Sequence, residues 1–571
     1  MNERTKTGLD ILKVAVITGI LGDVLLRVKP WGLNVLLFNV AFAVGVYVLL
    51  RRRAPQFLTG ETTALLGALV FFASMFAWRD SIQLRVADTF AIIAILSVLI
   101  VPRMKIPVRL AGIFHYVAAF FWSSFNALFM AAALLFVDIE WKLTRRFAIP
   151  KGVIAALKGL AIVAPLLLIF GALFVSADAV YEGWVNRIFN INIDLDFTHV
   201  ALFAVFAWLS AGYLRGVMLQ NPIAGEEPIT KDGTSGASRV DQVRSEVVEN
   251  PVALHNNLSI LEHINLSDPP ASPAPFSKPE KKPWDWAKID HTSIPTPLEL
   301  GGVEIGVILG LTNLLFLSFV IVQVPYLFGG MELVQSTPDF KLAEYARRGF
   351  GELVAVSALV LPMLLLGHWL IREGASRVHT LFRILACIQI ALLFVIMASA
   401  MQRLVLLTGN LGYGLTTVRL YPMIFMTWLA VVFVWFGFTV LRGARRHFAW
   451  GALWSAFFIL GTTHFVNPDE FIVKTNVALM QQGRPFDATY NARLSDDAIP
   501  ALLEAFPAMN MTDQCTVRAW LTRRLDAAAA ESDLRSWNFG RSKAAKAMRG
   551  ASLDMANCSD IVIDAVPTED L

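Results

Sequence analysis

Charged residues are scarce in this chain. Asp, Glu, Lys and Arg make up 16% of its 571 residues, and hydrophobic residues make up 56%. Ordinary soluble domains carry about 25% charged residues. A water-soluble protein of this composition would have too few polar side chains to cover its surface. The scarcity therefore excludes an ordinary soluble protein and predicts an integral membrane protein.

The sequence also lacks the short motifs that mark common catalytic and binding sites. It contains no Walker loop, no Gly-rich dinucleotide turn after a strand, no HExxH and no paired CxxC. Its nine histidines are scattered, and His255 and His263 would supply only two metal ligands. No basic and aromatic pattern typical of nucleic-acid binding occurs. We therefore predict no cofactor, no metal site and no nucleic-acid partner.

Long apolar runs recur along the chain, and a helix needs about 20 mostly apolar residues to cross a bilayer. Asp10, Lys13 and Asp23 interrupt the first run and no small-residue cleavage site follows it, so we expect an uncleaved helix there. The predicted fold is all-α, a polytopic transmembrane helix bundle of about 11–13 spans with a small α-helical soluble C-terminal tail. Spans are predicted at 9–27, 33–50, 62–78, 86–102, 152–176, 198–216, 299–323, 351–371, 378–402, 419–441 and 447–466.

The stretch 108–139 admits three interpretations. It is too long for one upright span, and basic clusters flank it on both sides. A tight helical hairpin gives about 13 crossings, an interfacial helix about 11 and a single tilted span about 12. The tilted span would place the two basic flanks on opposite sides of the membrane, which breaks the rule that Lys and Arg accumulate on one side.

Basic residues in the short loops predict the orientation, because cytoplasmic loops carry an excess of Lys and Arg. Such clusters, among them Arg51–Arg53 and Arg442–Arg446, fall on one side of the membrane in five loops. We therefore expect the N-terminus in the cytoplasm and the C-terminal tail outside.

Composition divides the chain into four parts. Residues 219–298 hold 11 of the 26 prolines and no sustained helical period, which predicts a disordered cytoplasmic linker. This linker separates an N-terminal transmembrane bundle, 1–218, from a C-terminal bundle, 299–466. Residues 467–571 are expected to form an α-helical tail of four helices. The helix starts are predicted from four N-cap residues, Asn467, Asp497, Thr512 and Asn538.

The richest polar stretch is 299–352. Glu344, Arg348 and Glu352 are spaced i, i+4, i+8, so on a continuous helix they share one face. Ionisable side chains at membrane depth are costly and usually face a cavity or a partner. The stretch predicts either an outward-facing polar site for a charged group or an interfacial ion network that fixes the helix entry. The candidate site comprises Glu304, Asn313, Gln323, Tyr326, Glu344, Arg347, Arg348 and Glu352.

Two arginines lie at the ends of a connection between spans. Arg403 precedes Gly412–Thr416, and Arg419 follows it. Their guanidinium groups are candidate contacts for an anionic group such as a lipid phosphate. Snorkelling of both side chains to the headgroups explains the same positions.

Several short motifs together resemble a known family. Tyr-Leu-Phe-Gly-Gly at 326–330 and Ala-Glu-Tyr-Ala-Arg-Arg-Gly-Phe at 343–350 occur in tandem. With the other motifs they resemble the bacterial membrane family called domain of unknown function 4173, over roughly four fifths of the chain. The resemblance implies a bacterial cytoplasmic membrane and supplies no activity. The other motifs are Trp78–Ser81, Ser176–Asp178, the span that begins at Glu304, Gly414–Tyr421, Leu494–Pro500 and Ser536–Asn538.

Cys515 and Cys558 lie in the tail, which the loop charges place outside the cytoplasm. Bacterial disulfides form and persist in that compartment. A helix from Cys515 to about residue 530 and a return helix from about 539 to 552 would bring the chain back to its starting end. We therefore predict a disulfide between the two, with two unrelated cysteines as the alternative.

Three functions remain open at this point. The leading hypothesis is a non-enzymatic envelope protein, a transport or sensing bundle with an outward-facing polar site. The first alternative is a membrane-embedded enzyme that acts on a lipid-linked or envelope substrate. The second is a scaffold whose tail binds a periplasmic partner. Besides the lipid bilayer, the expected partner is an anionic lipid or a charged small molecule.

Overall fold

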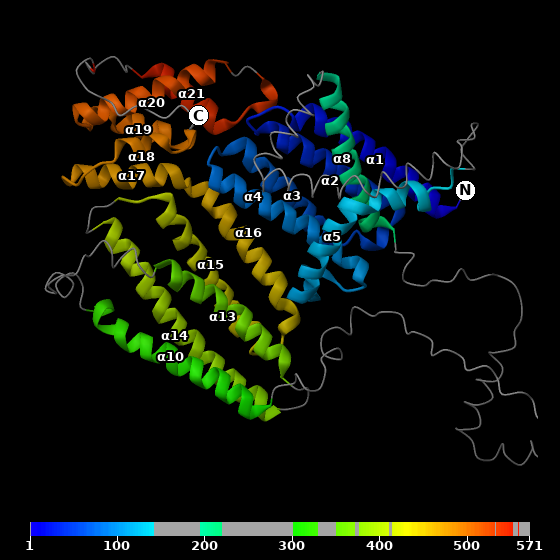
Figure 1. Ribbon diagram of the computed structural model, residues 1–571, viewed down its shortest axis with the longest axis horizontal. Helices are drawn as coiled ribbons and strands as arrows, with labels where there is room; N and C mark the ends of the chain where they lie inside the picture. The colour runs from blue at the N-terminus through cyan, green and yellow to red at the C-terminus, as the bar shows by residue number, and fades with distance from the viewer. Residues whose placement is uncertain are drawn as a thin grey trace, which may run out of the picture. The chain divides into compact units, whose positions relative to one another are not determined.

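The computed structural model shows a chain built from helices (Figure 1). It describes residues 2–141, 195–219, 301–328, 350–371, 376–409, 414–530, 533–551 and 558. Within these ranges there is no β-strand, and ten helices are long and apolar enough to cross a membrane. The predicted all-α polytopic fold is confirmed. The predicted span 152–176, and the predicted linker from residue 220 onward, lie outside the described residues.

Six helices form the described part of the N-terminal bundle. Their shared core contains Leu65, Phe72 and Ile95, all fully buried. The helices are α1 (Glu3–Leu26), α2 (Leu33–Arg53), α3 (Gly60–Trp78), α4 (Ile82–Val98), α5 (Ile113–Ala133) and α8 (Leu195–Met218).

Five helices form the C-terminal bundle as far as the structure describes it, and α10 runs alongside α14 (Figure 1). Phe382, Phe433 and Phe436 are buried in their common core. The helices are α10 (Gly302–Phe328), α13 (Phe350–Leu370), α14 (Ser376–Thr408), α15 (Thr417–Thr439) and α16 (Phe448–Val466).

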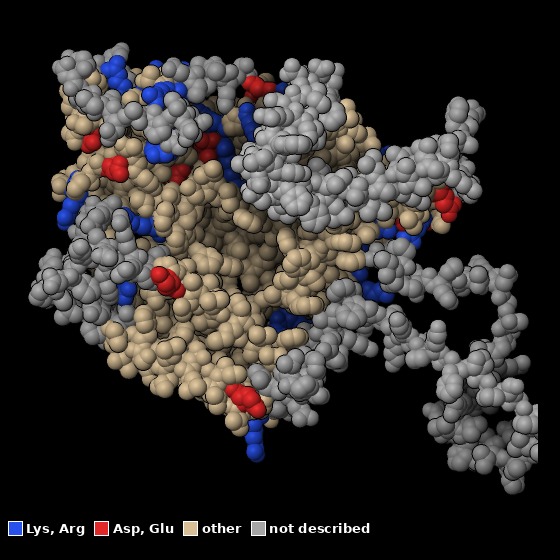
Figure 2. Space-filling view, viewed as in Figure 1, with Lys and Arg blue, Asp and Glu red and all other residues tan. Residues whose placement is uncertain are grey.

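The outer faces of these helices are apolar. Val303 is 77% exposed and Phe458 is 76% exposed. Figure 2 shows that charged side chains gather mainly over the tail helices, whereas the C-terminal membrane helices are largely uncharged on this face. Exposed apolar side chains on long helices suit a hydrocarbon surrounding and not water.

The contacts define two ends of the bundle. At one end, which we call the tail end, the turn after α1 and the turn after α3 contact the tail. The Leu33 amide donates to the Trp537 carbonyl at 2.9 Å, and Asn538 Nδ2 donates to the Arg79 carbonyl at 2.9 Å. The opposite, far end holds the start of α1, where Asp10 pairs with Arg53 at 2.6 Å.

The contacts of 108–139 favour one of its three interpretations. Length and composition alone would allow Ile113–Asp138 to span a membrane. However, both ends of this single helix lie at the far end. Tyr116 Oη donates to the Val108 carbonyl at 3.0 Å, and Asp138 accepts from Arg4 Nε at 2.7 Å at the start of α1. The contacts match the interfacial helix, because a hairpin would need a turn and a tilted span would finish at the tail end.

The described part of the tail contains five α-helices, one more than the four expected, since a short extra helix is capped by Asp487. Buried Ile472, Leu502 and Trp520 form its core. The helices are α17 (Pro468–Gln481), α18 (Ala488–Arg493), α19 (Ile499–Ala505), α20 (Met511–Ala530) and α21 (Phe539–Gly550).

The predicted caps of the tail helices are only partly right. Asn538 caps α21 by accepting from the Arg541 amide at 3.0 Å. At α20 the cap is Asn510 and not Thr512, because Asn510 accepts from the Asp513 amide at 2.9 Å. Asn467 makes no side-chain cap at α17. Asp497 lies inside a short 3-10 turn (Asp496–Ala498), and its side chain serves another helix.

Candidate functional site

The structure does not gather the polar residues of 299–352 into one described site. Glu304 is exposed at the start of α10, and Glu352 is exposed in the first turn of α13. The α10 start lies beside the α14 start, where Gly302 approaches Val378. The α13 start lies at the opposite end of the bundle, because His368, near the end of α13, has its ring centroid 5.7 Å from that of His379, near the start of α14. Glu304 and Glu352 are therefore far apart.

The other members of that candidate site divide into two groups. Asn313 is buried and donates from Nδ2 to the Leu385 carbonyl at 3.0 Å, which joins α10 to α14. This is a packing role. Outside the described residues lie Glu344, Arg347 and Arg348 and the side chains of Gln323 and Tyr326.

The two arginines at the ends of this connection, Arg403 and Arg419, lie among the described residues. Arg419 donates from its guanidinium to the carbonyl of Gly414, the residue at positive φ that begins the described connection to α15. Arg403 is partly buried in α14. Their role as lipid contacts stays a prediction.

A different polar site lies at the tail end, where α4, α15 and the tail meet. It contains a pocket of about 640 Å³ with three carboxylates, four hydroxyls, one amide and one guanidinium in its lining. The lining residues are Asp80, Ile82, Gln83, Thr417, Asp469, Asp487, Thr489, Tyr490, Arg493, Leu494 and Ser495.

Asp497 joins the tail to the membrane helices beside this pocket. Its Oδ2 accepts from the backbone amides of Asp80 and Ser81, at 2.6 and 3.3 Å, just before α4 begins. Ser81 makes no cap of its own. Gly540 allows the Asp497 carboxylate to lie close to the backbone of α21, because a Cβ at this position would clash with the carboxylate. Burial raises the pKa of Asp497 to about 6, against hydrogen bonds and the Arg79 charge that lower it.

Asp469 is the most enclosed carboxylate of the pocket. It lies in the first turn of α17 and is 1% exposed. The Ser495 hydroxyl donates to its Oδ2, while its Oδ1 is buried and has no hydrogen-bond partner among the described residues. No described Lys, Arg or His forms an ion pair with it. Burial raises the pKa of Asp469 above its ordinary value, although its position at a helix N-terminus favours a negative charge.

A second buried pair lies close by, within the membrane helices. Asp88 of α4 and His464 of α16 meet with an Oδ1–Nε2 distance of 2.9 Å, and their side chains are 1% and 0% exposed. Between this pair and the pocket, Tyr421 Oη lies 3.3 Å from Ser81 Oγ.

Sequence reasoning missed this site although its signals were present. Asp88 and His464 are ionisable residues inside predicted spans, which by themselves mark functional positions. The sequence alone indicates only a helix cap at Asp497. Their convergence depends on contacts between residues some 400 positions apart in the chain, which a single sequence does not reveal.

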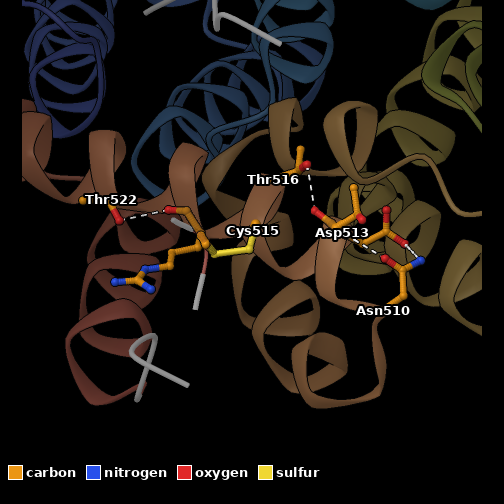
Figure 3. The surroundings of a disulfide bond; sticks show 8 residues. Asn510, Asp513, Cys515, Thr516 and Thr522 are labelled. Atoms are coloured by element: carbon orange, nitrogen blue, oxygen red, sulfur yellow. Dashed lines mark hydrogen bonds between the residues drawn. A yellow bond between two sulfur atoms is a disulfide. The ribbon is translucent and has the colours of Figure 1, made fainter. Parts of the chain in front are cut away.

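The two tail cysteines are joined in the structure (Figure 3). Their sulfur atoms are 2.01 Å apart and their Cα atoms 5.7 Å apart. This is the pairing that the sequence predicts. Among the described residues, no group of three or more His, Cys, Asp or Glu side chains could hold a metal ion.

Comparison with known proteins identifies the family. The family model described as Domain of unknown function (DUF4153) matches residues 66–254 and 266–505. The chain therefore belongs to that family. No curated protein matches the chain. No solved structure matches it.

The match corrects the resemblance to domain of unknown function 4173, which was wrong. Many of the motifs that suggested it lie at the ends of spans. Caps, small residues and boundary aromatics are favoured there by the bilayer itself, so unrelated polytopic proteins share them. Such motifs do not separate one membrane family from another.

Proposed function

We propose that this member of the DUF4153 family is a transport or sensing bundle whose pocket at the tail end binds a small organic cation. The observation that supports the proposal is Asp469, a buried carboxylate with one free oxygen and no ion pair in the described chain. A buried charge is costly unless it is paired. An ammonium group in the pocket would supply the missing charge and the missing hydrogen bond.

The pocket lining suits a primary ammonium. Carboxylates accept hydrogen bonds and hydroxyls both donate and accept, whereas an ammonium offers three donors. Asp80 is less available, because Arg85 and Arg541 both pair with it. Asp487 caps α18 through the Tyr490 amide at 2.8 Å. Asp469 is therefore the carboxylate left for a ligand.

The proposal includes an orientation in a bacterial cytoplasmic membrane. The far end carries Arg51–Arg53 and Arg103, and Arg445–His447 packs beside Val108–Leu110 there. The rule that basic residues accumulate on the cytoplasmic side supports a cytoplasmic N-terminus and a periplasmic tail. The disulfide in the tail agrees with this orientation. The pocket would then face the periplasm.

A binding experiment tests the proposal on the full-length protein in lipid nanodiscs. Putrescine, choline and succinate are added at neutral pH while thermal unfolding is followed by tryptophan fluorescence. Putrescine should raise the unfolding temperature in a saturable way, because a ligand that binds only the folded state stabilises it. Choline, which has no N–H donor, should do so less, and succinate should not. The Asp469→Asn variant should lose the putrescine effect. An equal response in that variant would refute the proposal.

The enzyme and scaffold alternatives stay predictions. A scaffold would bind a periplasmic protein through the tail without responding to small cations. An enzyme would convert the bound molecule, so recovery of unchanged putrescine argues for transport or sensing. Uptake of labelled putrescine into vesicles would separate transport from sensing.

A further inference from the structure

The pocket at the tail end contains a guanidinium group as well as carboxylates. Arg493, the last residue of α18, lines the same cavity of about 640 Å³ as Asp469. The binding of a simple cation gives this arginine no role, because a guanidinium repels an ammonium group. The lining therefore indicates that the ligand has a second chemical feature besides its positive charge.

The short helix α18 and the residues beside it supply much of the pocket lining. Six lining residues come from 487–495. Asp487 caps α18 by accepting from the Tyr490 amide at 2.8 Å. Tyr490 Oη in turn accepts from the amide of Thr417, the first residue of α15, at 2.7 Å. These contacts fix α18 to a membrane helix and hold the residue at its end, Arg493, beside the cavity.

Asp469 of α17 meets the same segment. The Ser495 hydroxyl, two residues after Arg493, donates to Asp469 Oδ2. The other oxygen, Oδ1, has no hydrogen-bond partner among the described residues. Asp469 forms no ion pair with a described residue, Arg493 included. The carboxylate and the guanidinium therefore lie in one cavity as two separate, opposite charges.

The Arg493 side chain is both positioned and accessible. Its guanidinium carbon lies over the ring of Trp520, 5.6 Å from the centroid, and Trp520 is buried in the core of the tail. The cation–π contact restricts where the guanidinium lies. Arg493 is nevertheless exposed, so a ligand can reach it. Because a guanidinium has five N–H donors, it can bind a ligand carboxylate in addition to its contacts within the tail.

We propose that the ligand of the pocket is a cationic amino acid, which carries a carboxylate as well as ammonium groups. This inference rests on the proposed function and names the ligand class. One ammonium group pairs with Asp469, and the carboxylate accepts two parallel N–H···O bonds from Arg493. A diamine would instead turn its second ammonium group towards a guanidinium. The described lining holds three carboxylates and one guanidinium, so its net charge favours a cationic amino acid over a neutral one.

Two ligands that differ by one group test the proposal. L-Ornithine is putrescine with one added carboxylate, the group that Arg493 is proposed to bind. Calorimetry on the full-length protein in nanodiscs gives both dissociation constants at neutral pH. Ornithine should bind about five- to tenfold more tightly, as expected for a bidentate ion pair at an exposed position. Arg493→Gln should lose this preference, while putrescine binds as tightly as before or more tightly. Arg484→Gln, an exposed arginine before α18, is the matched control and should keep it.

The outcomes separate the two proposals. Equal affinities for ornithine and putrescine in the wild type would overturn the amino-acid ligand and leave the cation site intact. A preference that persists in Arg493→Gln would overturn it too, even if both ligands bind more weakly, because a purely structural defect weakens both alike. No binding of either ligand to the wild type would overturn both proposals. If Arg493→Gln does not fold, Arg493→Lys replaces it. Lysine keeps the charge without the fork, so the preference should fall, and an unchanged preference would overturn the inference.

Discussion

The buried carboxylates at the two ends of the membrane bundle differ in their ion pairing. At the far end, Asp138 is enclosed by two arginines, with Arg4 Nε at 2.7 Å and Arg215 Nε at 2.6 Å. At the tail end, Asp469 is equally buried and forms no ion pair with a described residue. A paired carboxylate cross-links helices, whereas an unpaired one is costly to the fold. The comparison indicates that the far end is built for stability and the tail end for binding.

The largest effect on stability should follow from removing the paired carboxylate at the far end. Asp138→Asn leaves Arg215 buried without its carboxylate, and loss of one member of a buried pair costs roughly 3–5 kcal/mol. Thermal unfolding of the purified protein should show a large drop in stability. Asp10→Asn is the control at the same end, because its pair with Arg53 is partly exposed and should cost about 1 kcal/mol or less. Equal losses in the two variants would contradict the comparison.

Removal of the disulfide should have the next largest effect. The bond closes a separation of 43 residues, and the loss of chain entropy on cross-linking predicts a stabilisation of up to roughly 4 kcal/mol. Cys515→Ser should therefore unfold at lower temperature than the wild type. The same bond tests the orientation. A membrane-impermeant maleimide applied to intact cells should label the tail only after reduction. Labelling without reductant would argue against the disulfide, and protection after reduction would argue against a periplasmic tail.

The pH dependence of stability should be a smaller effect. Burial raises the pKa values of Asp496 and Asp497 to about 6, above the ordinary value of 3.8. Between about pH 4 and 6 the folded protein therefore binds more protons than the unfolded chain, so stability falls as pH rises through this window. The total change should be on the order of 1–3 kcal/mol. Unfolding temperatures of the wild type and of Asp497→Asn measure it, and the variant should show a shallower decline. A rise in stability from pH 4 to 6 would contradict the assignment.

The smallest effect on stability is expected at the unpaired carboxylate. Asp469→Asn removes a buried charge that no described cation offsets, so the variant should be as stable as the wild type or slightly more stable. It should nevertheless lose putrescine binding. Chemical denaturation compares it with Asp138→Asn. A destabilisation as large as that of Asp138→Asn would show that Asp469 serves the fold.

Much of the membrane fold could be predicted from the sequence, because the bilayer requires long apolar helices and the chain displays them directly. The sequence could not decide whether α5 crosses the membrane or lies at its surface. One end of α5 is held by Arg4, which is distant in the chain, and the contact of the other end with Val108 follows no periodic pattern. The structure of the tail was partly predictable, through the helix cap at Asn538 and the pairing of the two cysteines.

The candidate site was less predictable than the fold. Spacing on one helix led to Glu344 and Arg348, whereas the described pocket is made by side chains from α4 and the turn before it, α15, α17, α18 and the tail turns. Asp497 illustrates the difficulty. Three positions before Pro500, it has the sequence of an ordinary helix cap, yet it accepts hydrogen bonds from residues 80 and 81. Local rules describe such a residue correctly only when its tertiary partner is known.

The availability of Asp469 to a cation can be measured directly with an apolar carbodiimide, which reacts with protonated carboxyl groups. Full-length protein in nanodiscs is treated at about pH 6, and the modified residues are identified by mass spectrometry. We predict that Asp469 is modified, because burial raises its pKa, and that putrescine protects it. Asp138, whose two oxygens are each held by an arginine, should give no product. Modification of Asp469 to the same extent with and without putrescine, or of Asp138 instead, would contradict the account.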